Sequence, residues 1–142
     1  MNTLINKFSQ INSTDVKSVG GKNSSLGEMF NQLSPKGINI PDGFATTVDA
    51  WWLFLESNHL KEKLSELMNG LDKKSFSNLR EVGNEARQLV LNGTMPDELK
   101  KEIIKFYHDL FQNESVAEVA VRSSATAEDL PTASFAGQHD SF

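Results

Sequence analysis

The spacing of apolar residues divides this chain into a long helical stretch and a β-rich end. Between residues 24 and 112, apolar side chains recur every three or four positions, the period of an amphipathic helix. Pro, Gly and capping residues separate these stripes, so we predict five helices, near residues 24–34, 47–57, 59–70, 75–91 and 95–112. After residue 115 the period changes, and Val116–Val121 is predicted to be a short buried strand.

Capping signals mark the beginnings of two of these helices. Thr46 or Thr47 can cap the helix near 47–57, with Asp49 in its first turn to complement the helix dipole. Thr94 can cap the last helix, with Pro96 near its first position. These signals place the two helix starts within a few residues.

The remaining segments read as extended chain or loop. Together with the helices they predict an α+β fold in one domain, residues 1–142, with a small sheet that includes Val116–Val121 and the Gly137 segment. The predicted segments are an edge strand within Leu4–Ile11, a small-residue loop over Ser18–Ser25, extended chain at Ile38–Phe44 with a turn at Pro41-Asp42-Gly43, and a second strand over Ala133–Phe142.

Composition excludes several classes of function. The net charge of −5 argues against a general nucleic-acid binder, which would carry a basic face. The absence of cysteine excludes disulfides and thiolate metal sites. The most apolar run, Ala50–Leu55, is far shorter than the roughly 20 residues that span a bilayer, and the N-terminus has no signal-peptide pattern. We therefore expect a cytoplasmic protein with no membrane partner.

The loop Gly20-Gly21-Lys22 opens the first predicted helix and is a candidate phosphate site. Glycines let backbone amides approach a phosphate closely, and the lysine adds a mobile positive charge. The loop is not a Walker motif, because that pattern needs glycine where Val16 stands and Ser or Thr where Asn23 stands. An ordinary glycine turn with a solvated lysine is the alternative.

Arg122 follows the predicted strand and is a second candidate, because strand ends often carry ligand contacts in α/β folds. Its planar guanidinium can donate two parallel hydrogen bonds to phosphate. The small side chains of Ser123, Ser124 and Thr126 add further donors. The alternative is a structural ion pair with a carboxylate just downstream, at Glu128 or Asp129.

Two further features near the C-terminal end bear on chemistry. Gly137 lies within a strand pattern, which indicates either a bulge or a close approach of backbone to a ligand. The three histidines, at positions 59, 108 and 139, have no second histidine or carboxylate at metal-ligand spacing. The residues therefore predict no metal site.

Three stretches, taken in order and spacing, resemble the phosphoenolpyruvate synthase family. They are Val19–Met29 (VGGKNSSLGEM), Ile40–Thr47 (IPDGFATT) and the block Ala120–Pro131 (AVRSSATAEDLP) followed by Ala133–Gln138 (ASFAGQ). The last block is the most specific, and the resemblance extends over essentially the whole chain.

The resemblance implies the first lobe of an ATP-grasp-type nucleotide-binding domain, cut from a larger multidomain enzyme. By motif position, Lys22 and Arg122 would contact ATP phosphates, and Gly137 and Ser141 would line the phosphate loop. Many members carry Thr where Ser141 stands, and Ser keeps the hydroxyl. In the family, phosphate passes from ATP to a phosphohistidine domain and then to pyruvate. The acceptor histidine, the pyruvate site and the Mg²⁺ ligands would all lie outside residues 1–142.

Alternatives remain at this stage. Rifampin phosphotransferases share this domain and nearly the same arginine block, although the residues after Lys22 and the IPDGFATT block favour the synthase. Pyruvate, phosphate dikinases have a different arginine block. The chain could also be a non-catalytic helical interaction module. If the nucleotide reading holds, Lys22 and Arg122 should converge although 100 positions separate them, because a triphosphate needs positive charge from more than one side.

Overall fold

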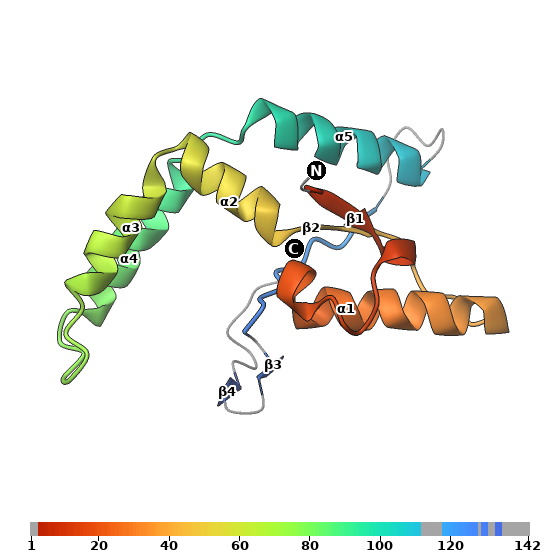
Figure 1. The fold of residues 1–142 in the computed structure, drawn as a ribbon, viewed down its shortest axis with the longest axis horizontal. Coiled ribbons are helices and arrows are strands. Elements are labelled where there is room, and N and C mark those ends of the chain that lie inside the picture. The colour runs from red at the N-terminus through yellow and green to blue at the C-terminus, as the bar shows by residue number, and fades with distance from the viewer. Residues whose placement is uncertain (1–2, 112–117, 128, 131–132, 135–142) are drawn as a thin grey trace.

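Residues 3–111, 118–127, 129–130 and 133–134 are described by a computed structural model, and they form five α-helices and two small sheets (Figure 1). The helices are α1 (Val16–Leu33), α2 (Val48–Ser57), α3 (Leu60–Asn69), α4 (Leu79–Leu91) and α5 (Asp97–Phe111). The strands are β1 (Ile5–Lys7), β2 (Phe44–Thr46), β3 (Asp129–Leu130) and β4 (Ala133–Ser134), and short 3₁₀ turns cover Phe8–Gln10 and Ser34–Lys36.

The β1–β2 sheet and α1 enclose the first core. The two strands are antiparallel, with Ile5 opposite Thr46 and Lys7 opposite Phe44. Ile11, Val19 and Ala45 are each less than 5% exposed and form one cluster, against which Phe8 packs. Because Val19 belongs to α1 and Ala45 to β2, this cluster fixes the beginning of α1 on the sheet.

Side-chain hydrogen bonds hold the chain before α1 against the second half of that helix. The Asn31 side-chain amide donates to the carbonyl oxygens of Phe8 and Ile11, at 3.2 and 2.9 Å. Gly27, one turn earlier, packs directly on Ile11. The close approach of the two segments therefore depends on a residue without a side chain.

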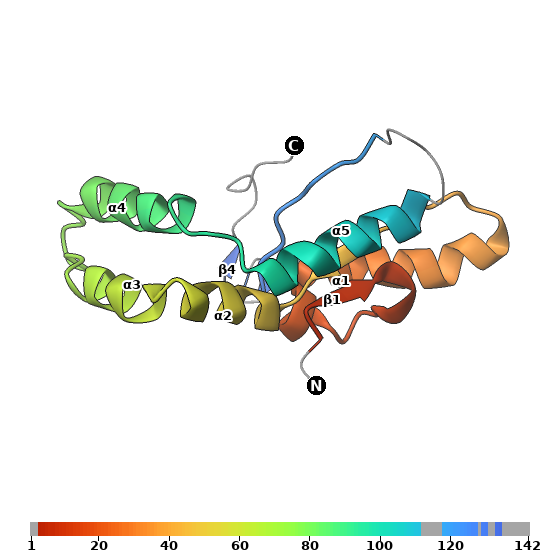
Figure 2. The same ribbon diagram turned by 90° about the horizontal axis from the view of Figure 1, so that it is seen from above.

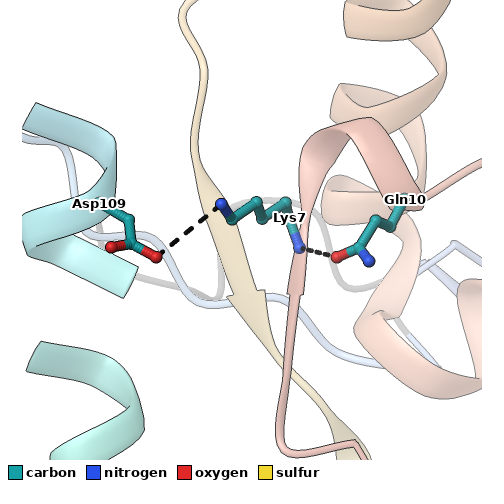
Figure 3. Close-up of polar contacts among 3 residues, drawn as sticks. All are labelled: Lys7, Gln10 and Asp109. Carbon is teal, nitrogen blue, oxygen red and sulfur yellow. Dashed lines mark hydrogen bonds and ion pairs between the residues drawn. The ribbon is translucent and has the colours of Figure 1, made fainter. Parts of the chain in front are cut away.

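Helix α5 lies beside the β1–β2 sheet and is attached by mixed contacts (Figures 2 and 3). The Phe44 and Phe106 rings are 5.8 Å apart between centroids. Lys7 Nζ lies 5.6 Å from the Phe106 ring and 4.0 Å from an Asp109 carboxylate oxygen, while the Lys7 N–H donates to Gln10 Oε1. The ion pair is half exposed, so the aromatic contact holds α5 more firmly than the charges do.

Helices α2, α3 and α4 form a second unit, in which α3 and α4 run side by side away from the first sheet (Figures 1 and 2). Its core is Phe54, Leu55 and Leu60, with Leu64, Leu89 and Val90 packed on it. The Asn58 side chain closes the unit by donating to the Thr94 carbonyl and accepting from the Thr94 N–H. None of the described helices has both the length and the apolar character to cross a membrane.

Four of the five predicted helices match within four residues at each end. Of the two residues predicted to cap α2, Thr46 and Thr47, it is Thr47 that does so: its hydroxyl accepts from the Ala50 N–H at 3.4 Å and also donates to the Thr3 carbonyl at 2.7 Å. Thr94 does not cap α5. Its backbone pairs with Asn58, and the Lys100 N–H donates to the Pro96 carbonyl at the helix start.

The predicted loop over Ser18–Ser25 is wrong, because α1 already begins at Val16 and includes it. Gly20 interrupts this helix with φ 82° and ψ 164°, so its two halves meet at a kink. Helix α4 begins later than predicted, at Leu79 rather than near residue 75. The preceding turns are held by Asp72, whose carboxylate accepts from Ser75, Ser77 and the Lys74 N–H.

The predicted strand Val116–Val121 is also not found in the part that is described. Residues 118–121 belong to no helix or strand, and Val119 and Val121 are 48% and 62% exposed. Residues 116–117 lie outside the described ranges. Of the second predicted strand only Ala133–Ser134 is described, paired antiparallel with Asp129–Leu130 in a separate two-stranded sheet. The α+β class is confirmed, while the single shared sheet is not.

Candidate functional site

The kink in α1 lies two residues before Lys22. Gly20 stands at the point where the second half of the helix begins, in a backbone conformation that side-chain-bearing residues rarely adopt. Gly20 and Gly21 are buried, and Lys22 is half-buried in the first turn after the kink. The Asn23 side-chain amide donates back to the Val19 carbonyl at 2.9 Å, which ties the two halves together across the kink.

The segment that follows Arg122 packs against this kink. The Gly21 N–H donates to the Ala125 carbonyl at 3.3 Å, and the Asn23 N–H donates to Ser124 Oγ at 3.4 Å. A Cβ atom on Gly20 would lie 2.9 Å from the Ser124 carbonyl carbon and 3.0 Å from the Ala125 nitrogen. Backbone therefore lies on backbone here, and only glycine fits between them.

The two candidate cations are thus carried by segments in direct contact. Lys22 lies between the two amides that bond to residues 124 and 125, and Arg122 lies two positions before Ser124. Arg122 is exposed and stands at an isolated β-bridge. The segments that carry Lys22 and Arg122 are therefore in contact, while the convergence of the two charged groups stays a prediction.

Gly137 and Ser141 lie outside the described residues, as does Glu128, and the Asp129 side chain is not described. The structure therefore leaves their predicted roles, and the ion-pair alternative for Arg122, as predictions. Within the described ranges, no group of three or more His, Asp or Glu side chains is arranged to hold a metal ion.

Sequence reasoning missed how Ser124 and Asn23 are used. Ser124 was expected to be one of several small donors beside Arg122, but its hydroxyl accepts a hydrogen bond from the other segment. Ser24, next to Asn23, is 2% exposed, and its hydroxyl has no hydrogen-bond partner among the described residues. The sequence feature that points to this contact is Gly20, which stands where the second half of α1 begins. A glycine there provides no side chain to cap the helix, so the cap must come from another residue.

Comparison with known proteins identifies the family. The sequence model described as "Pyruvate phosphate dikinase, AMP/ATP-binding domain" matches residues 16–142, beginning at the first residue of α1. The chain is 46% identical over 137 residues to the phosphoenolpyruvate synthase of Helicobacter pylori, covering 95% of this chain and 17% of that protein. It is 46% identical to the enzyme of the same name from Synechocystis over 145 residues and 42% identical to that of Escherichia coli over 139 residues.

These last two matches cover 98% of this chain and 18% of either relative, so the chain spans less than a fifth of the length of each of the three relatives. The match includes both segments of the candidate site, from the α1 kink to the residues around Arg122. The resemblance predicted from the three motifs is confirmed, and the chain belongs to the family of pyruvate phosphate dikinase AMP/ATP-binding domains.

Proposed function

We propose that this chain is the first nucleotide-binding lobe, of ATP-grasp type, of a longer phosphoenolpyruvate synthase. The parent enzyme would convert pyruvate, ATP and water to phosphoenolpyruvate, AMP and phosphate, the direction used in gluconeogenesis. The family membership and the names of the three relatives support this assignment. The rifampin phosphotransferase alternative has no support among those relatives.

The contact between the α1 kink and the segment after Arg122 carries the proposal. Lys22 and Arg122 would bind the ATP phosphates from two sides and stabilise the charge that shifts during phosphoryl transfer. Gly137 and Ser141 would line the phosphate loop on the remaining side. The arrangement fits a polyphosphate because two segments in direct contact each carry one cation, and a polyphosphate needs positive charge from more than one side.

The other parts of the reaction would come from elsewhere in the parent enzyme, which we propose is cytoplasmic. The Mg²⁺ ion would neutralise phosphate charge and hold the phosphates in line, with carboxylate ligands outside residues 1–142. The phosphohistidine domain and the pyruvate site would likewise lie downstream. This lobe would therefore bind ATP without completing the reaction.

The test is amide hydrogen exchange of the 142-residue chain with and without ATP. We expect weak binding, with a dissociation constant on the order of millimolar, because half of the clamp and the metal ligands are missing. Saturating ATP should slow exchange at Gly21 and Asn23. Lys22→Gln should weaken ATP binding about tenfold or more, the cost of losing a charge-assisted hydrogen bond. Lys17→Gln, an exposed lysine on the same helix, should leave binding unchanged.

If ATP at several times the expected dissociation constant changes no exchange rate near Lys22, the chain is better described as a helical interaction module. Activity gives a second check. Incubated with ATP, Mg²⁺ and pyruvate, the chain should form no phosphoenolpyruvate. Turnover at about 1 s⁻¹ or faster, the range of ordinary kinases, would show that a complete site lies within these residues.

A further inference from the structure

The beginning of the second half of α1 lacks a capping side chain of its own. A helix leaves its first amides without partners inside the helix, and a Ser, Thr, Asp or Asn at the capping position usually accepts from the third amide. Here the capping position is Gly20, the residue with non-helical φ and ψ, and the third amide after it is that of Asn23.

Ser124 supplies the missing group. Its hydroxyl oxygen lies against Gly20, within the space that a Cβ atom there would occupy, and it accepts from the Asn23 N–H. Relative to the helix it therefore takes the place of a capping side chain, although it stands 101 positions away in the sequence. The neighbouring Ala125 carbonyl accepts from the first amide, that of Gly21.

We propose that Ser124 is a positioning residue, which caps the helix of Lys22 from the segment of Arg122 and so fixes the register of the two segments. A cap within α1 would stabilise the helix alone. A cap provided by the other segment couples the formation of this helix turn to the contact between the two segments. Lys22 is therefore ordered only when the segment of Arg122 is in place. The consequence for ATP rests on the proposed function, while the geometric part does not.

The first test needs no nucleotide. Ser124→Ala removes the acceptor and leaves the backbone shape, so exchange at the Asn23 amide should accelerate by about two- to tenfold, the range for one hydrogen bond. The Gly21 amide should accelerate with it, although its own acceptor, the Ala125 carbonyl, is unchanged. Ser25→Ala, which removes an exposed hydroxyl from the same helix, is the matched control and should change neither rate.

Faster exchange at Asn23 with an unchanged Gly21 would mean that Ser124 only caps the helix, and the positioning role would be refuted. Unchanged exchange at both amides would refute the cap itself. Exchange at the buried Val19 amide reports whether the variant keeps the first core. If Ser124→Ala unfolds that core, Ser124→Thr, which keeps the hydroxyl, must restore native rates at Gly21 and Asn23 for the proposal to stand.

The second test measures ATP affinity in the same variants. The apparent dissociation constant is the intrinsic constant divided by the fraction of chains in which the two segments are in contact, so it should rise by the factor by which Ser124→Ala lowers that fraction. Weaker ATP binding with a protected Gly21 amide would show that Ser124 touches the nucleotide directly, which contradicts a positioning role. If the wild-type chain binds no ATP, the proposed function is refuted. The exchange rates at Gly21 and Asn23 would still decide whether Ser124 fixes the register of the two segments.

Discussion

Replacing the buried Gly27 with alanine should change the stability of the fold in two opposite directions, through helix propensity and through steric overlap. Gly27 lies inside α1, where alanine has a higher helix propensity by about 1 kcal/mol. Its Cβ would, however, lie 2.6 Å from both the Cβ and the carbonyl oxygen of Ile11, and 2.7 Å from Ile11 Cγ2. Ile11 is fully buried, so it has no free space into which to move.

The steric effect should win. Overpacking a filled core costs about 1–3 kcal/mol, and the atoms concerned here are backbone and Cβ, which move only with the chain. Displacing the Ile11 carbonyl also weakens the 2.9 Å hydrogen bond from Asn31, worth about 1 kcal/mol. After the gain of about 1 kcal/mol in propensity, Gly27→Ala should lower the free energy of unfolding by about 1–3 kcal/mol.

A second glycine provides a control of opposite sign. Gly83 lies inside α4, and a Cβ atom there would meet nothing within 4 Å. Gly83→Ala should therefore raise the free energy of unfolding by about 0.5–1 kcal/mol. Urea denaturation followed by circular dichroism measures both variants. Equal or greater stability of Gly27→Ala relative to the wild type would refute the packing argument for α1.

Two further predictions concern the helical unit α2–α4. Asn58→Ala removes a side chain that pairs with both backbone groups of Thr94, so stability should fall by about 1–3 kcal/mol and the Thr94 amide should exchange faster. Hydrogen bonds from the Ser75 hydroxyl, the Ser75 and Lys74 amides and the Ser77 hydroxyl hold the pKa of the Asp72 carboxyl well below its usual range. The stabilisation from Asp72 is therefore fully present above its unfolded pKa of about 3.9 and is lost as the pH falls towards the lower folded value. An NMR titration should show the Asp72 midpoint below the unfolded value of about 3.9, and a midpoint at 3.9 or higher would contradict this assignment.

Helix positions were predictable where local chemistry decided them. The apolar residues of α2 and α3 pack into one shared core, and Thr47 caps α2 with its own hydroxyl. The later start of α4 and the missing Thr94 cap of α5 have a shared cause, which is a polar side chain outside the apolar pattern. Asp72 gathers the residues before α4 into turns, and Asn58 engages Thr94, the residue expected to cap α5.

The sheet and the α1 kink depended on distant residues, which the sequence pattern does not contain. Val119 and Val121 suit a strand, but their propensity produces none in the described chain without a partner strand beside them. At Gly20 the backbone is held by a segment about 100 positions away. Lys22 and Arg122 could be recognised as candidates from their charge alone. The role of Ser124 could not be predicted, because it depends on Gly20, which has no capping side chain and lies in a distant segment.

The long sequence separation of the kink contact also sets an order of events during synthesis. Neighbouring helices such as α3 and α4 can pair soon after they leave the ribosome, because closing a short loop costs little entropy. The Asn23 amide meets Ser124 only after 101 further residues have been made, which at ordinary translation rates takes roughly 5–20 s. During that interval the nascent chain holds its glycine-rich turn without the hydroxyl that caps the second half of α1.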